Sequence, residues 1–281
     1  MEGSMTGKVV MVTGANAGMG KEIVLALAGM GARVAMVSRD RARGEVARAE
    51  VQQKVAGAAL ELLIADLSSQ QSIRDLVREF TSHHERLHVL VNNAGVTQRR
   101  RVESADGLES VFAINHLGPF LLTGLLLPVL TASAPSRVVT VASGAHAMGK
   151  IDFDDLQSAR GYDEIRVYNQ SKLANLLFSY ELARRIAGSG VTANAADPGF
   201  VKTNLRVPFP YSIFSFMRGS AVDGARPAVF LASSPEVEAV SGRYFNQKGE
   251  VKSSKLSYDE DIARRLWDVS AGLTSMASAK R

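Results

Sequence analysis

The chain has 281 residues, of which 46% are hydrophobic, and a formal net charge of +5. This length and composition are ordinary for a globular protein with one core. Because there is no cysteine, disulfides, thiolate metal sites and cysteine nucleophiles are excluded, and the scattered basic residues form no stripe of the kind that binds nucleic acid.

The predicted elements alternate between strand and helix along the chain. Short apolar, β-branched runs bounded by turn residues indicate buried strands, and helical apolar patterns lie between them. Strands are expected at residues 8–13, 32–38, 60–65, 87–92, 136–142, 190–196 and 243–246, and helices at about 18–29, 40–56, 69–83, 106–131, 165–188 and 222–233. This order predicts a single α/β domain, a doubly wound (Rossmann) fold with a parallel sheet of about seven strands and helices on both faces.

No segment is expected to cross a membrane. The longest apolar segment, residues 120–130, is interrupted by threonine, glycine and proline, so it predicts a buried helix. No basic and apolar secretory leader opens the chain, and residues 1–5, which contain a second methionine, are interpreted as a cloning remnant. We therefore expect a soluble, cytoplasmic protein.

A glycine-rich turn follows the first predicted strand. Residues 13–20 read Thr-Gly-Ala-Asn-Ala-Gly-Met-Gly and lead directly into a helix. Glycines there let the backbone approach a pyrophosphate, whose charge is met by the amides at the helix N-terminus. The spacing differs from Gly-x-Gly-x-x-Gly, and no Gly-Lys-Ser/Thr of a P-loop follows. The turn predicts a dinucleotide-binding site.

The end of the second predicted strand bears on cofactor choice. An acidic residue there would bind a ribose 2′-hydroxyl and repel a 2′-phosphate. This chain has Ser38 at that position, followed by Arg39, whose guanidinium suits a phosphate. Asp40 is the rival for the ribose, but it is better placed as the cap of the next helix. The sequence therefore predicts NADP(H) as the cofactor.

Tyr168 and Lys172 lie four residues apart in a helical pattern, so they share one helix face. A phenol with a pKa of about 10 exchanges protons poorly near neutral pH, and a positive charge nearby favours its ionised form. The pair therefore suits proton transfer to or from an alcohol or carbonyl oxygen.

These motifs, in this order, resemble the short-chain dehydrogenase/reductase family. Thr13 to Gly20, the aspartate after the third strand, the Asn-Asn-Ala-Gly segment and the final Pro-Gly segment all match it. The resemblance implies the catalytic residues Asn115, Ser143, Tyr168 and Lys172. It also implies an NADP(H) site, which includes Tyr168 and Lys172 together with Gly14, Asn16, Ala17, Gly18, Met19, Gly20, Ser38, Arg39, Asp66, Leu67, Asn92, Ala94, Gly95, Pro198, Gly199, Val201 and Thr203.

The resemblance also implies a role for each catalytic residue. In reduction, Tyr168 donates the proton and Ser143 hydrogen-bonds the same carbonyl oxygen. Lys172 bonds the nicotinamide ribose and lowers the tyrosine pKa, while Asn115 holds a water that connects the lysine to solvent. The cofactor supplies the hydride.

The segment between Ser143 and Tyr168 resembles the retinol-dehydrogenase-like branch, because the two residues stand 25 positions apart. After Pro198-Gly199, residues of about 200–221 are expected to form a substrate lid that includes Phe214 and Phe216. The alternatives are that these aromatic residues pack the loop onto the core, form a subunit contact or touch a membrane surface. Apolar side chains in a lid favour a lipophilic small-molecule substrate. Relatives commonly pair through the helices of Asn115 and Tyr168, so a homodimer or homotetramer is implied.

Two other functions share parts of this pattern. Sugar-nucleotide epimerases and dehydratases use the fold with a Tyr/Lys pair, but with a different glycine turn and a larger C-terminal domain. A non-catalytic NADP-binding regulator would keep the cofactor residues and lose the catalytic ones, which are intact here. His84 and His88 match His-Glu-x-x-His, yet His88 opens a strand, so we expect no metal site.

Overall fold

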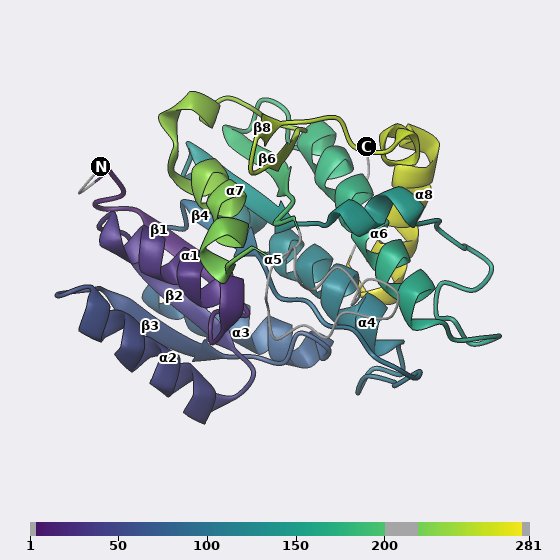
Figure 1. Ribbon diagram of the computed structural model, residues 1–281, viewed down its shortest axis with the longest axis horizontal. Helices are drawn as coiled ribbons and strands as arrows, with labels where there is room; N and C mark the ends of the chain where they lie inside the picture. Colours follow the sequence, from purple (N-terminus) through teal and green to yellow (C-terminus); the bar gives the residue numbers. More distant parts are fainter. Residues whose placement is uncertain (1–3, 200–218, 277–281) are drawn as a thin grey trace.

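The computed structural model describes residues 4–199 and 219–276, and it confirms the predicted fold class (Figure 1). The sheet has the order β3-β2-β1-β4-β5-β6-β7-β8, and its first seven strands pair in parallel. The strands are β1 Val9–Thr13, β2 Arg33–Ser38, β3 Leu60–Ile64, β4 Val89–Asn92, β5 Ser136–Val141, β6 Val191–Ala196, β7 Tyr244–Asn246 and β8 Gly249–Glu250.

Helices cover both faces of the sheet. On one face, α1 (Gly18–Gly29), α2 (Arg41–Lys54) and α7 (Ala221–Ser233) pack against the strands and form one apolar core. On the other face, α3 (Gln70–His83), α5 (Gly118–Ala132) and α6 (Glu164–Arg185) form a second. Because both faces are covered, the strands are continuous apolar runs instead of alternating ones.

The strand order reverses between β1 and β4, because the chain moves outward to β2 and β3 and then returns to the other side of β1. In such a sheet the loops at the carboxyl ends of the central strands diverge and leave a crevice where ligands bind. The glycine turn follows β1, and residues 93–97 follow β4, so both lie at this crevice.

The C-terminal elements are the part of the fold that the sequence did not predict. The short strand β8 pairs antiparallel with β7, and α8 (Glu260–Leu273) packs along α6. Trp267 of α8 lies 4.9 Å from the Phe120 ring and 5.9 Å from the Phe178 ring, which fixes the helix on the core. Met5 is also buried in the core, and its amide donates to the Met30 carbonyl.

The helix predicted at 106–131 begins later and is irregular. It starts with α4 (Ser110–Phe112), continues as a π turn, η1 (Ala113–Leu117), and ends as α5. Residues 110–132 are long and apolar enough to span a membrane by length and composition, which the sequence analysis did not recognise. In this fold 67% of the most apolar part is buried against other elements, so the segment is a core helix.

Candidate active site

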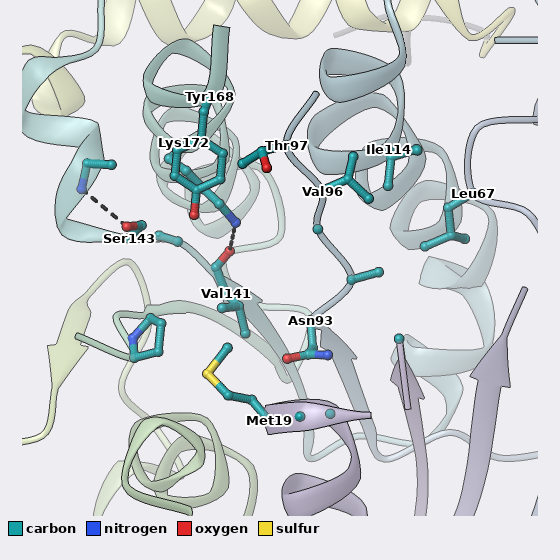
Figure 2. A pocket seen from close by; sticks show the side chains of 18 of the residues that line it. Met19, Leu67, Asn93, Val96, Thr97, Ile114, Val141, Ser143, Tyr168 and Lys172 are labelled. Carbon is teal, nitrogen blue, oxygen red and sulfur yellow. Dashed lines mark hydrogen bonds between the residues drawn. The ribbon is translucent and has the colours of Figure 1, made fainter. Parts of the chain in front are cut away.

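A cavity of about 740 Å³ opens at the carboxyl ends of the central strands (Figure 2). The glycine turn and the end of β2 form one end, and residues of β5, α6 and the Pro198-Gly199 segment form the other. Most residues predicted for the site line this cavity: Gly14, Asn16, Ala17, Gly18, Met19, Gly20, Arg39, Asp66, Leu67, Ala94, Gly95, Ser143, Tyr168, Lys172, Pro198 and Gly199.

Four predicted cofactor residues are not part of the described wall. Ser38 is buried, and its hydroxyl donates to the Asp40 carbonyl instead of facing the cavity. Asn92 is buried in β4, where its amide donates to the Thr123 hydroxyl. Neither residue lines the cavity, since successive strand residues point to opposite faces. Val201 and Thr203, with the predicted lid, lie outside the described residues.

Two residues that the sequence analysis missed do line the cavity next to those positions. Asn93 takes the place expected for Asn92, and its amide nitrogen donates to the Thr13 carbonyl at 2.8 Å. Arg43 joins Arg39 at the end of β2. Asp40 caps α2, as predicted: its carboxylate accepts from the Arg43 backbone amide at 3.0 Å. That carboxylate oxygen is therefore already hydrogen-bonded within the helix cap.

The glycine turn is shaped for close approach of a ligand to the backbone. A Cβ at Gly20 would lie 2.1 Å from the Gly14 carbonyl oxygen, so only glycine fits there. Gly18 has φ of 52°, which favours glycine, and a Cβ there would meet no atom within 4 Å. The Thr13 hydroxyl accepts from the Asn93 and Ala94 amides and ties the turn to β4. These residues fit a dinucleotide pyrophosphate.

Asn115 lies behind the cavity wall, on the π turn. Its carboxamide oxygen accepts from the Val96 amide at 2.8 Å, and its nitrogen donates to the Val96 carbonyl and the Ser171 hydroxyl, each at 3.0 Å. A Cβ at Gly95 would lie 3.5 Å from both the Asn115 oxygen and Lys172 Nζ. Asn115 therefore positions the loop that passes beside Lys172.

Ser143, Tyr168 and Lys172 converge at the other end of the cavity (Figure 2). Lys172 Nζ donates to the Val141 carbonyl at 3.1 Å and lies 5.6 Å from the centre of the Tyr168 ring. The Ser143 hydroxyl oxygen accepts from the Ala145 amide at 3.2 Å, which leaves its proton available for donation. A phenol, a hydroxyl and an amine thus surround one space.

The electrostatics of this group differ from the sequence expectation. Burial raises the pKa of Tyr168 to about 12, and a hydrogen bond with Ser143 only partly opposes that shift. Burial also lowers the pKa of Lys172 to about 8, against the opposing charge of Asp197. In the structure, burial therefore favours the protonated phenol and the neutral amine.

Asp197 is a further charged group in the wall that the sequence analysis did not single out. Its Oδ1 accepts from the Gly199 amide at 2.9 Å and its Oδ2 accepts from the Tyr244 hydroxyl at 2.7 Å. These bonds fix the start of the Pro198-Gly199 segment. The carboxylate also favours the charged form of Lys172.

Neither histidine of the His-Glu-x-x-His pattern lines the cavity. His84 is paired with Glu61 at 2.5 Å, whereas His88 Nδ1 accepts from the Val9 amide at 3.0 Å. The two imidazoles thus have separate partners, and no group of three or more metal-ligating side chains occurs within residues 4–199 and 219–276. His146 lies behind Ser143.

Comparisons with known proteins agree with this site. The family model described as short chain dehydrogenase matches residues 8–210. Human retinol dehydrogenase 14 is 44% identical over 291 residues, covering 95% of this chain and 86% of that protein. A crystal structure of an uncharacterized protein from Mycobacterium Paratuberculosis has a TM-score of 0.80 and 35% identity, covering 96% and 94% of the two chains.

A second solved structure contains a bound cofactor. It comes from Beutenbergia cavernae, is assigned as an NAD(P)-dependent gluconate 5-dehydrogenase and holds NADP at low occupancy. It is 25% identical, with a TM-score of 0.70, and the match covers 88% of this chain and 97% of that one. The glycine turn, the Ser143, Tyr168 and Lys172 group and these matches together place the chain in the short-chain dehydrogenase family, in its retinol-dehydrogenase-like part.

Proposed function

We propose that the protein is an NADP-dependent oxidoreductase that interconverts an alcohol and a ketone or aldehyde on a lipophilic substrate. The observation that carries the proposal is the single cavity that joins the glycine turn and two arginines to Ser143, Tyr168 and Lys172. One end is suited to a phosphorylated dinucleotide and the other to proton transfer at an oxygen atom.

In reduction, each of these residues would have a separate role. The bound nicotinamide supplies the hydride. Tyr168, protonated because of its burial, donates a proton to the carbonyl oxygen on which negative charge develops. Ser143 donates a second hydrogen bond to the same oxygen and orients it. Lys172 and the glycine turn would hold the cofactor.

The preference for NADP rests on charge at the end of β2. Arg39 and Arg43 both line the cavity there, and neither forms an ion pair with another residue of the described ranges. Asp40, the acidic residue that follows Arg39, accepts from the Arg43 backbone amide as the helix cap. Two free guanidinium groups favour a 2′-phosphate over a hydroxyl.

The lipophilic character of the substrate rests on the wall beside Tyr168. Val96, Ile114, Met148 and Ile165 line the cavity there, and Met148 is 59% exposed. Apolar walls favour apolar ligands and exclude water from the reacting atoms. The relatives named retinol dehydrogenase support the same substrate class.

This proposal is tested with a homologous series of aldehydes and ketones of increasing chain length, followed through the oxidation of NADPH. We expect kcat/KM to rise by up to about fourfold for each buried methylene, which corresponds to about 0.8 kcal/mol. Ile165→Ala should flatten that rise, whereas Val222→Ala, at an exposed position outside the cavity wall, should not. A best rate with small polar carbonyls would overturn the lipophilic assignment, and no turnover of any carbonyl would overturn the enzyme assignment.

The rate of reduction is expected to fall as the pH rises through about 8. Lys172 loses its proton near that pH, because burial has lowered its pKa to about 8, while Tyr168 keeps its proton up to about 12. As the pH rises, the protonated form of Lys172, which would hold the cofactor, is therefore lost before the protonated form of Tyr168. The measurement is kcat/KM for reduction between about pH 6 and pH 10, which reports the groups of the free enzyme. A first decline only near pH 10 would contradict this assignment.

A further inference from the structure

Ser143 is bonded from behind by a histidine that does not enter the cavity. The carbonyl oxygen of Ser143 accepts from His146 Nδ1 at 2.7 Å and from the His146 backbone amide at 3.1 Å. On the other side of the ring, the Ser254 backbone amide donates to His146 Nε2 at 3.0 Å. The imidazole thus connects the serine to a segment more than 100 residues later in the chain.

The partners of the ring define its protonation state. Nε2 faces an N–H donor, so it carries the lone pair, and the single proton of the neutral ring is on Nδ1, where it is donated to Ser143. Burial lowers the pKa of His146, against the bond to Ser143 and the charge of Asp197, so burial favours the neutral form. The Tyr244 ring meets the imidazole edge-on at 5.2 Å and limits its rotation.

The far end of this connection is also fixed. The hydroxyl of Ser253, the residue before Ser254, bonds the Tyr180 hydroxyl at 2.8 Å and the Ser257 hydroxyl at 2.6 Å. The Tyr180 ring stacks on Tyr258 at 5.3 Å. The residues that follow β8 are therefore anchored to α6, the helix that carries Tyr168 and Lys172.

We propose that His146 is a positioning residue for the reaction: in its Nδ1–H form it holds the Ser143 backbone against Ser254, and so sets the place of the Ser143 hydroxyl relative to Tyr168. Ser143 follows the end of β5, with φ of −173°, and begins the short turn η2 (Gly144–Met148). Without the ring, the turn amide would be the one remaining bond to its carbonyl among the described contacts. This inference rests on the proposed function.

The test compares three substitutions at this position. His146→Phe keeps a ring against Tyr244 and removes both hydrogen bonds. His146→Asn restores a donor near the place of Nδ1, and His146→Gln places an amide nearer to Ser254. We expect His146→Phe to lower kcat by about 10- to 100-fold, because a displacement near 1 Å is enough for such a loss. His146→Asn should recover part of it, and the Kd for NADPH should change by less than about twofold.

A double-mutant cycle separates positioning from a general loss of structure. In a Ser143→Ala background, His146→Phe should cost less than about a twofold further loss in kcat, because the hydroxyl it positions is already absent. His84→Phe, at a histidine outside the cavity whose side chain is 8% exposed, is the matched control and should leave kcat unchanged in both backgrounds. Equal losses with and without the Ser143 hydroxyl would overturn the proposal.

A spectroscopic arm does not depend on turnover. In protein with ¹⁵N-labelled histidine, the His146 signals should show a protonated Nδ1 and an unprotonated Nε2 at neutral pH, and the signal of the Ser254 amide should move in His146→Phe. The reversed tautomer, or an unchanged Ser254 signal, would overturn the inference whatever the activity. If wild-type protein reduces no carbonyl while the tautomer is as expected, the proposed function has failed and the His146 connection is purely structural.

Discussion

Tyr168→Phe is expected to lower turnover by about 10²- to 10⁴-fold and to leave the fold and the cofactor affinity intact. Phenylalanine keeps the ring in the cavity wall and removes only the hydroxyl. With it goes the proton that burial holds in place, since the pKa of Tyr168 is raised to about 12. Ser143 remains able to bond the carbonyl oxygen but has no comparable acidity. The measurement is single-turnover reduction with NADPH, together with the Kd of NADPH and the melting temperature.

Tyr162→Phe is the matched control for this substitution. The Tyr162 hydroxyl donates to the Gln98 carbonyl at 3.1 Å, next to the loop at residues 93–97. Tyr162 itself is not part of the cavity wall. Its loss should affect stability modestly and turnover little. A near-normal kcat in Tyr168→Phe, with Ser143→Ala also active, would show that the reaction takes place elsewhere.

The double substitution of Arg39 and Arg43 by alanine is expected to weaken NADPH binding by 10²- to 10⁴-fold and to leave NADH binding nearly unchanged. Each guanidinium can form a charge-assisted hydrogen bond to a phosphate, at about 1.5 to 3 kcal/mol, and the two are lost together. NADH has no 2′-phosphate, so it loses only weak long-range attraction. The measurement is the Kd of each reduced cofactor, followed by nicotinamide fluorescence.

Arg41→Ala provides the control for the cofactor prediction. Arg41 begins the same helix, α2, and is exposed, but it does not line the cavity. Its removal takes away one positive charge without removing a group at the end of β2. Similar losses for NADPH and NADH in the double variant, or higher wild-type efficiency with NADH, would contradict the NADP assignment.

The sequence predicted the two ends of the cavity because each is encoded locally. A buried strand, a glycine turn and a helix occur in succession at residues 8–29, and Tyr168 and Lys172 follow from helical spacing. The assignment of individual residues at strand ends was less secure. Asn92 and Asn93 are adjacent and identical in type, and only the exact end of β4 determines which of them faces the cavity.

Other features had no local signal. The Ser254 contribution to the site is a backbone amide, so no side-chain type marks it. Residues 39–48 contain four arginines, and nothing in the sequence distinguishes Arg43 from the others. It lines the cavity because of the course of α2. The pKa of Lys172 depends on its burial, which the sequence pattern did not provide.

The π turn at residues 113–117 has a consequence for how this chain can change. A π turn contains one residue more than an α-helical turn, and removing that residue would let residues 110–132 form a regular helix. In an α-helix each residue adds about 100° of rotation about the helix axis. The deletion would therefore rotate Asn115 relative to the residues on the other side of the deleted position. Its bonds to Val96 and Ser171 could not survive that rotation. At this turn a regular α-helix is incompatible with the hydrogen bonds of Asn115, so we expect a deletion that regularises the helix to disrupt the loop beside Lys172.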